Sequence, residues 1–306
     1  MYGLMFHHFY DEKHPKGQGA IDGDDLDNIL NYVGVDNIVE PSEWIHRAKS
    51  NALLDGELCL TFDDNLRCQF DVAVPVMEKY GLKGFWFIYT SPFTGVSQKL
   101  EVYRYFRNSC FNTISDFYIG FFAKAKESKF SADVEKHCKN FKPGEYLEEY
   151  PFYTDADRLF RYIRDVVLGE SAYFDVMDAM LDESGVDVKK ASSDLFMGER
   201  HIRDLHSKGH IIGLHSHSHP TLIENLSYED QMSEYQQNYH LISEIVGENP
   251  RVMSHPCNSY NKVTFKVLRK IGIEIGFRSN MAPVRNRGNF EIPREDHANI
   301  IAKLKY

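Results

Sequence analysis

Short apolar runs alternate with amphipathic segments over both ends of the chain. The apolar runs predict strands at residues 4–9, 58–62, 84–89, 210–214, 251–254 and 273–277. Amphipathic spacing and capping residues predict helices at 24–33, 41–50, 199–207, 227–247 and 262–271, and one that ends at Gly81. A strand, a helix and a second strand at this spacing form a unit with parallel strands. The pattern therefore predicts an α/β fold on a parallel sheet, either open or closed as a barrel.

The middle of the chain has a different pattern. Residues 91–197 carry helical periodicity and few strand signals. We interpret them as a helical insertion within a single catalytic domain that covers residues 1–306. The aromatic stripe of this insertion is typical of helices that pack on one another, although it also fits a substrate-binding wall.

Composition and charge narrow the function classes. The chain has 35 basic and 45 acidic side chains, a net charge of −10, which disfavours a nucleic-acid partner. Its five cysteines form no Cys-x-x-Cys pair, which indicates a reducing compartment. The N-terminal residues lack the basic and apolar regions of a secretory signal, and no window approaches the roughly 18 apolar residues of a membrane span. We therefore expect a cytoplasmic protein without a membrane span; the sequence does not indicate its oligomeric state.

Two predicted strands end in unusual polar sequences. Thr61-Phe62-Asp63-Asp64 ends the second strand, and His215-Ser216-His217-Ser218-His219 follows the fourth. In parallel α/β folds, the carboxyl ends of the strands carry the functional site. Two imidazoles and one carboxylate suit a catalytic Zn²⁺ or another divalent transition ion, and a second carboxylate can accept a proton from water. Each sequence also has a purely structural interpretation. The aspartates can cap the helix that follows, and the histidines can belong to a solvated loop.

Together these sequences resemble the motifs T-F-D-D and H-[ST]-x-x-H of the polysaccharide deacetylase family, the NodB-homology domain of the carbohydrate esterases. The resemblance covers about residues 4–90 and 198–299 and excludes the helical insertion. It implies a distorted, incomplete (β/α) barrel. It also implies that Asp64, His215 and His219 bind the metal and that Asp63 is the general base. His217 falls on a variable position of the motif, which suggests a role in the loop.

The third family motif is only partly present, at residues 253–260. Pro256 is kept, but the family's arginine is absent, and Cys257 and Asn258 replace an aromatic residue and a glycine. The resemblance implies that the backbone N–H of Cys257 helps to bind the oxyanion, since a backbone donor survives side-chain replacement. A nucleophilic role for Cys257 is the weaker alternative.

The remaining candidates come from strand ends near the two termini. Residues 290–297 resemble the closing strand of the family, which suggests His297 as the general acid. Arg294 and Asp296 would then replace the missing support for the base. Arg278 is a rival for that role or for binding an anionic group, and His8, at the end of the first strand, is expected to line the pocket.

The resemblance implies a metal-dependent hydrolase that removes an N-acetyl group from an amino sugar, a carbohydrate N-deacetylase of surface polysaccharide biosynthesis. The expected cofactor is one Zn²⁺, with Co²⁺ or Ni²⁺ as alternatives. The expected substrate is an acylated amino sugar or a nucleotide-linked sugar. A deformylase, a hydrolase of small cyclic amides and a catalytically inactive carbohydrate-binding relative are the competing hypotheses.

Overall fold

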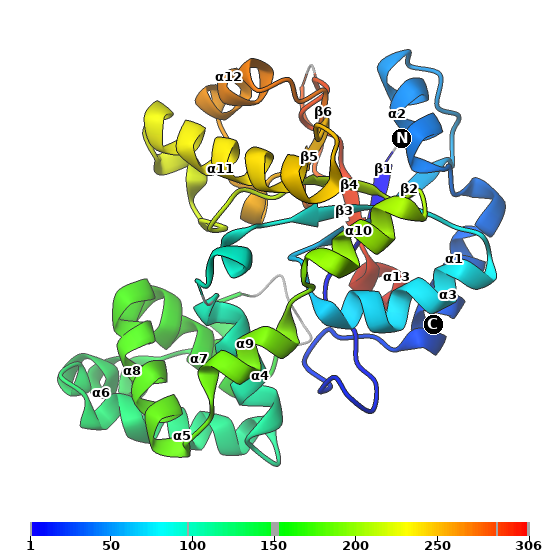
Figure 1. Ribbon diagram of the computed structural model, residues 1–306. Coiled ribbons are helices and arrows are strands. Elements are labelled where there is room, and N and C mark those ends of the chain that lie inside the picture. The colour runs from blue at the N-terminus through cyan, green and yellow to red at the C-terminus, as the bar shows by residue number, and fades with distance from the viewer. Residues whose placement is uncertain (1, 97, 148–152, 286, 305–306) are drawn as a thin grey trace. The chain divides into compact units, whose positions relative to one another are not determined.

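The computed structural model describes residues 2–96, 98–147, 153–285 and 287–304. The chain divides into two compact units, one of Met1–Gln98 with Ser193–Tyr306 and one of Lys99–Ser192 (Figure 1). The first unit contains the sheet, and the second is helical in its described part.

The sheet of the first unit is built from seven parallel strands of the described residues, in the order β6-β5-β4-β3-β2-β1-β7. The strands are β1 (Tyr2–Phe6), β2 (Leu58–Asp63), β3 (Gly84–Ile88), β4 (Ile211–Leu214), β5 (Val252–Ser254), β6 (Ile275–Phe277) and β7 (Arg294–Asp296). The helices of this unit are α1 (Gly23–Val33), α2 (Pro41–Lys49), α3 (Val74–Lys79), α10 (Glu199–Ser207), α11 (Tyr228–Val246), α12 (Lys262–Lys270) and α13 (His297–Leu304) (Figure 1). A π-helical turn, Gln69–Ala73, leads into α3.

The segment before β7 links the two edges of the sheet. Ile292 pairs with Phe277 at the end of β6, and the Arg278 N–H donates to the Ile292 carbonyl at 2.8 Å. Directly afterwards, β7 pairs with β1 at the opposite edge. The sheet therefore curves into a nearly closed barrel, and the predicted incomplete (β/α) barrel is confirmed.

Alternation along the strands divides their side chains between two layers. Phe6, Phe62 and Trp86 belong to the larger core, where Phe62 stacks on Trp86 at 4.2 Å between ring centroids. The neighbouring positions, such as Phe85 and Phe87, belong to a second core inside the barrel. Because both faces are covered, β2 and β3 are buried at every position, as parallel strands usually are.

The second unit is a group of packed helices. These are α4 (Lys99–Ser109), α5 (Ile114–Glu127), α6 (Ser131–Asn140), α7 (Asp155–Tyr162), α8 (Gly169–Ser184) and α9 (Val188–Leu195, whose last residues lie in the first unit). Their aromatic side chains form a buried core, with Phe121 at 4.9 Å from Phe160 and 6.0 Å from Tyr173 between ring centroids. No helix of the described residues has the length and apolar character needed to cross a membrane.

A buried histidine at the start of β4 makes the fold sensitive to acid. The Nδ1 atom of His210 accepts hydrogen bonds from the Gly84 N–H and the Trp86 indole N–H, both at 3.1 Å. Burial, with a smaller effect of Lys208 and Lys83, lowers the pKa of His210 from 6.5 to about 4. The stability that neutral His210 contributes is therefore complete above pH 6.5, and is lost as the pH falls from 6.5 towards 4.

We expect His210→Asn to flatten this pH dependence, because the amide oxygen keeps an acceptor but does not titrate. Between pH 7 and pH 5, the free energy of unfolding of the wild type should fall by about 2 kcal/mol more than that of the variant. Urea unfolding at the two pH values measures the difference. Equal pH dependence of the two proteins would show that His210 does not titrate as the structure indicates.

Candidate metal centre

Three loops with unusual backbone conformations meet the carboxyl ends of β2, β4 and β5. Eight residues other than glycine have positive φ in the described residues, and six of them lie in these loops: Asp64 (78°), Asn65 (56°), Ser216 (62°), His219 (56°), Cys257 (49°) and Asn258 (58°). Left-handed backbone in such residues is unfavourable and tends to collect at functional sites. The candidate motifs therefore lie in the loops that contain most of the left-handed residues other than glycine.

The Asp64 carboxylate faces two imidazoles. Its Oδ1 atom lies 3.3 Å from Nε2 of His215 and 3.4 Å from Nε2 of His219. The ligand atoms of the three residues all lie within 4.8 Å of one another. Oδ1 is buried and accepts no hydrogen bond of good geometry. A buried carboxylate oxygen between two imidazole nitrogens fits a divalent transition ion, and three protein ligands leave positions open for water and substrate.

A hydrogen bond to the backbone orients the buried ring of His215. Its Nδ1 atom lies 2.9 Å from the Ser254 carbonyl oxygen, which can only accept, so Nδ1 carries the proton. In the neutral imidazole the lone pair is then on Nε2, which faces Asp64. Such outer hydrogen bonds are typical of metal-binding histidines.

The Asp63 carboxylate is held by a fully buried arginine. Arg294 donates to its two oxygens at 2.7 and 2.6 Å, and the Ser254 hydroxyl donates to Oδ2 at 3.1 Å. Burial raises the pKa of Asp63, but Arg294 and His215 together lower it below its ordinary value. Asp63 is therefore ionised at neutral pH, as a general base must be. Arg294 of β7 therefore makes the contact with Asp63 that the sequence offered as a replacement for the arginine missing from the third motif.

The imidazole that faces both carboxylates from β1 is His7. Its Nε2 atom lies 4.0 Å from Asp63 Oδ2 and 3.9 Å from Asp64 Oδ2, and 29% of its side chain is exposed. The expected first strand ends at residue 9, which made His8 the candidate for the pocket. In the structure β1 ends at Phe6, which pairs with Phe62, so that His7 is level with Asp63.

The structure does not bring His297 to the carboxylates, which corrects its assignment as the general acid. Its ring is buried against Phe6 at 5.7 Å between centroids. Its Nδ1 and Nε2 atoms lie 3.2 Å from the Met5 carbonyl oxygen and 3.0 Å from that of Gly19. The register explains this position. Met5 pairs with Asp296, so the next residues, Phe6 and His297, lie side by side. Both side chains point out of the barrel, whereas the alternate positions along the two strands face its interior.

Two further candidates support the backbone and do not contact Asp63. Buried Arg278 donates to the Ala282 carbonyl at 2.9 Å and to the Asn280 side chain, and so holds the loop after β6. Asp296 accepts from the Ala298 N–H at 2.8 Å, at the start of α13. Neither side chain contacts Asp63, although the Arg278 backbone carbonyl accepts a hydrogen bond from Nε of Arg294.

Cys257 is near the aspartates but is not activated. Cys257 is an exposed residue, but desolvation by the surrounding protein and the charges of Asp64 and Asp63 raise the pKa of its thiol to about 11. The thiol therefore stays protonated at neutral pH, which argues against a nucleophilic role.

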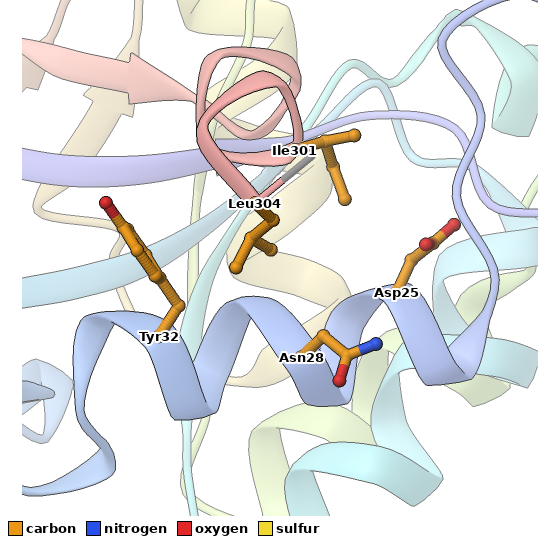
Figure 2. Close-up of a pocket in the computed structure, with 5 residues that line it drawn as sticks. All are labelled: Asp25, Asn28, Tyr32, Ile301 and Leu304. Atoms are coloured by element: carbon orange, nitrogen blue, oxygen red, sulfur yellow. The ribbon is translucent and has the colours of Figure 1, made fainter. Parts of the chain in front are cut away.

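A separate groove lies between α1 and α13. It has a volume of about 430 Å³ and is lined by Asp25, Asn28, Tyr32, Ile301 and Leu304 (Figure 2). None of these residues belongs to the metal cluster, so this groove is distinct from the candidate centre.

Comparison with known proteins connects this geometry to one family. The family described as polysaccharide deacetylase matches residues 178–276. This segment contains His215, His219 and Pro256, but it does not contain Asp63 or Asp64. No curated protein sequence matches the chain. The resemblance to this family is thus supported by a match outside the Thr61–Asp64 motif.

Several solved structures share the fold over nearly the full chain. The deacetylase PplD of Streptococcus pyogenes, in complex with acetate, has a TM-score of 0.57 at 14% identity, covering 99% of this chain and 96% of its own. IcaB from Ammonifex degensii has a TM-score of 0.55 at 12% identity, covering 100% and 97%. A de-N-acetylase from Aggregatibacter actinomycetemcomitans has a TM-score of 0.54 at 13% identity, covering 99% and 98%. At these identities the likeness concerns the fold.

Proposed function

Because the chain is similar to polysaccharide deacetylases in sequence and in fold, we propose that it is a metal-dependent hydrolase that removes N-acetyl groups from amino sugars of a polysaccharide. The observation that carries this proposal is the meeting of three groups at one barrel end: the cluster of Asp64, His215 and His219, the carboxylate of Asp63, and the imidazole of His7. Separately, these groups are common in proteins. Together, they supply a metal site, a base and an acid for amide hydrolysis.

In this proposal, Asp64, His215 and His219 hold one divalent transition ion, with Zn²⁺ as the expected metal. When bound, such an ion polarises the acetamide carbonyl and acidifies a neighbouring water. The same donor set also accommodates Co²⁺ or Ni²⁺.

The protein's own groups then move the protons. Asp63, held in place by Arg294, accepts a proton as the water oxygen forms a bond to the carbonyl carbon. The C–N bond then breaks, and His7 donates a proton to the departing nitrogen. The products are acetate and a free amine. Two hydrogen bonds from one guanidinium fix the orientation of this carboxylate. Asp63 therefore stays aligned with the attacking water during the reaction.

The substrate class follows from the relatives and from the charges near the site. Relatives of the same fold are described as polysaccharide deacetylases and as a de-N-acetylase. A nucleotide-linked sugar carries a diphosphate, which requires free cations. The two arginines discussed above are buried and bonded within the protein, Arg294 to Asp63 and Arg278 to its own loop. We therefore favour a neutral acetylated polysaccharide over a nucleotide-linked sugar.

A panel of oligosaccharides tests this function. We expect acetate and free amine in equal amounts from oligomers of N-acetylglucosamine, and release that is about 10²- to 10⁴-fold slower with Asp63→Asn. Formate from an N-formyl sugar without acetate from the acetylated one would favour a deformylase. Hydrolysis of small cyclic amides but not of acylated sugars would favour a cyclic-amide hydrolase. Binding of an oligosaccharide without release of any acid would identify a catalytically inactive relative.

A further inference from the structure

The loop between the two histidine ligands is bonded to a single carboxylate on α11. Glu234 Oε2 accepts hydrogen bonds from the backbone N–H groups of His217 at 3.0 Å and Ser218 at 2.8 Å. Its Oε1 atom accepts from the Ser218 hydroxyl at 2.7 Å. Hydrogen bonds to a charged acceptor are among the stronger ones in proteins, so these three bonds fix the centre of the loop.

One helical turn later, Asn238 holds the beginning of the same loop. This fully buried amide accepts from the His215 N–H at 2.9 Å and donates to the Ile88 carbonyl at 2.8 Å. It also donates to the Thr90 hydroxyl at 3.2 Å, which in turn lies 3.0 Å from Nδ1 of His217. Asn238 thus ties the first ligand to the end of β3.

The loop needs such support because of its backbone. Ser216 and His219 both have left-handed φ values, 62° and 56°, and each such residue costs on the order of 1 kcal/mol or more. The Ser216 hydroxyl stabilises the turn by accepting from the His219 N–H at 3.1 Å. That bond closes the turn locally but does not anchor it to the barrel, whereas the bonds from α11 do.

We propose that Glu234 and Asn238 are positioning residues, which hold His215 and His219 at the separation that a metal ion requires. The two side chains lie four residues apart on one face of α11. The Thr90 and Ser91 N–H groups also hold the loop, by donating to the His217 carbonyl at 3.1 and 2.9 Å. This inference rests on the proposed function, because it assumes that the two histidines bind metal. Loss of outer-shell support typically lowers metal affinity about 10- to 100-fold.

Zn²⁺ affinity, measured by competition with a chromogenic chelator, tests the inference. Glu234→Ala removes all three acceptors, while Glu234→Gln keeps one oxygen of similar position. We expect Glu234→Ala to weaken Zn²⁺ binding about 10- to 100-fold and Glu234→Gln to weaken it less. Glu244→Gln, an exposed carboxylate on the same helix, is the matched control and should bind as the wild type does.

Two additional readouts separate positioning from general stability. We expect the absorption spectrum of bound Co²⁺ to change in the Glu234 variants, because the ligand geometry changes, while thermal unfolding of the metal-free proteins stays close to that of the control. Zn²⁺ affinity of Glu234→Ala equal to that of the wild type would overturn the inference. It would also be overturned if the Co²⁺ spectrum were unchanged and the loss of Zn²⁺ affinity matched the fraction of unfolded protein. Failure of the wild type itself to bind either ion would overturn the proposed function on which the inference rests.

Discussion

Asp63→Asn is expected to lower kcat by about 10²- to 10⁴-fold while the protein still binds its metal. The amide cannot accept the proton of the attacking water, whereas the ligands Asp64, His215 and His219 are untouched. The substitution also removes the negative charge that faces buried Arg294. A buried guanidinium without its partner is destabilising, so we expect a lower unfolding temperature as well.

The two effects are separated by measuring them on the same preparation. Turnover on an acetylated oligosaccharide is determined well below the unfolding temperature of the variant, together with its Zn²⁺ content. A folded variant that contains metal but turns over slowly supports the role of Asp63 as the base. A folded variant with turnover close to that of the wild type would remove Asp63 from this role.

His7→Asn is expected to lower kcat by a comparable factor of about 10²- to 10⁴-fold, because the departing nitrogen then lacks its proton donor. The effect on stability should be small, since 29% of the His7 side chain is exposed. The matched control is His297→Gln, at the histidine that the sequence suggested for the same role. Because His297 is buried between backbone carbonyls, this variant should be less stable but should keep its kcat.

Comparison of kcat and unfolding temperature for the two variants assigns the acid. A large loss of kcat in the His297 variant, with little change in the His7 variant, would reverse our assignment. The His297 variant also controls for general effects of replacing a histidine that follows a strand of the same barrel.

The proximity of Asp63 and Asp64 to His215 and His219 could be predicted because these residues belong to contiguous motifs. Asp63 and Asp64 end one buried strand, and His215 and His219 follow another, so that the parallel sheet alone brings them to one end of the barrel. Arg294 was a harder case, because it is 231 residues from Asp63. It was anticipated only as one of several possible supports.

The identity of the acid depends on strand register, which a single sequence does not reveal. Phe6 pairs with Phe62, and Met5 pairs with Asp296. These pairings put His7 level with Asp63 and direct His297 towards Phe6. A difference of one residue in register exchanges the two faces of a strand. The expected strand at residues 4–9 therefore pointed to His8 in place of His7 as the pocket residue, and the resemblance of residues 290–297 to a closing strand pointed to His297 as the acid. Glu234 and Asn238 could not be predicted as supports of the loop, because in the sequence they are ordinary polar positions of an amphipathic helix.

The central claim is that Asp64, His215 and His219 form one metal site, and equilibrium dialysis against Zn²⁺ tests it most directly. We expect about one ion per chain in the wild type and in His217→Ala, whose imidazole lies in the same motif but contacts Thr90. Asp64→Ala and His215→Ala should each lose the ion while remaining folded. An absence of bound Zn²⁺ in the wild type, or equal Zn²⁺ in all four proteins, would contradict the account.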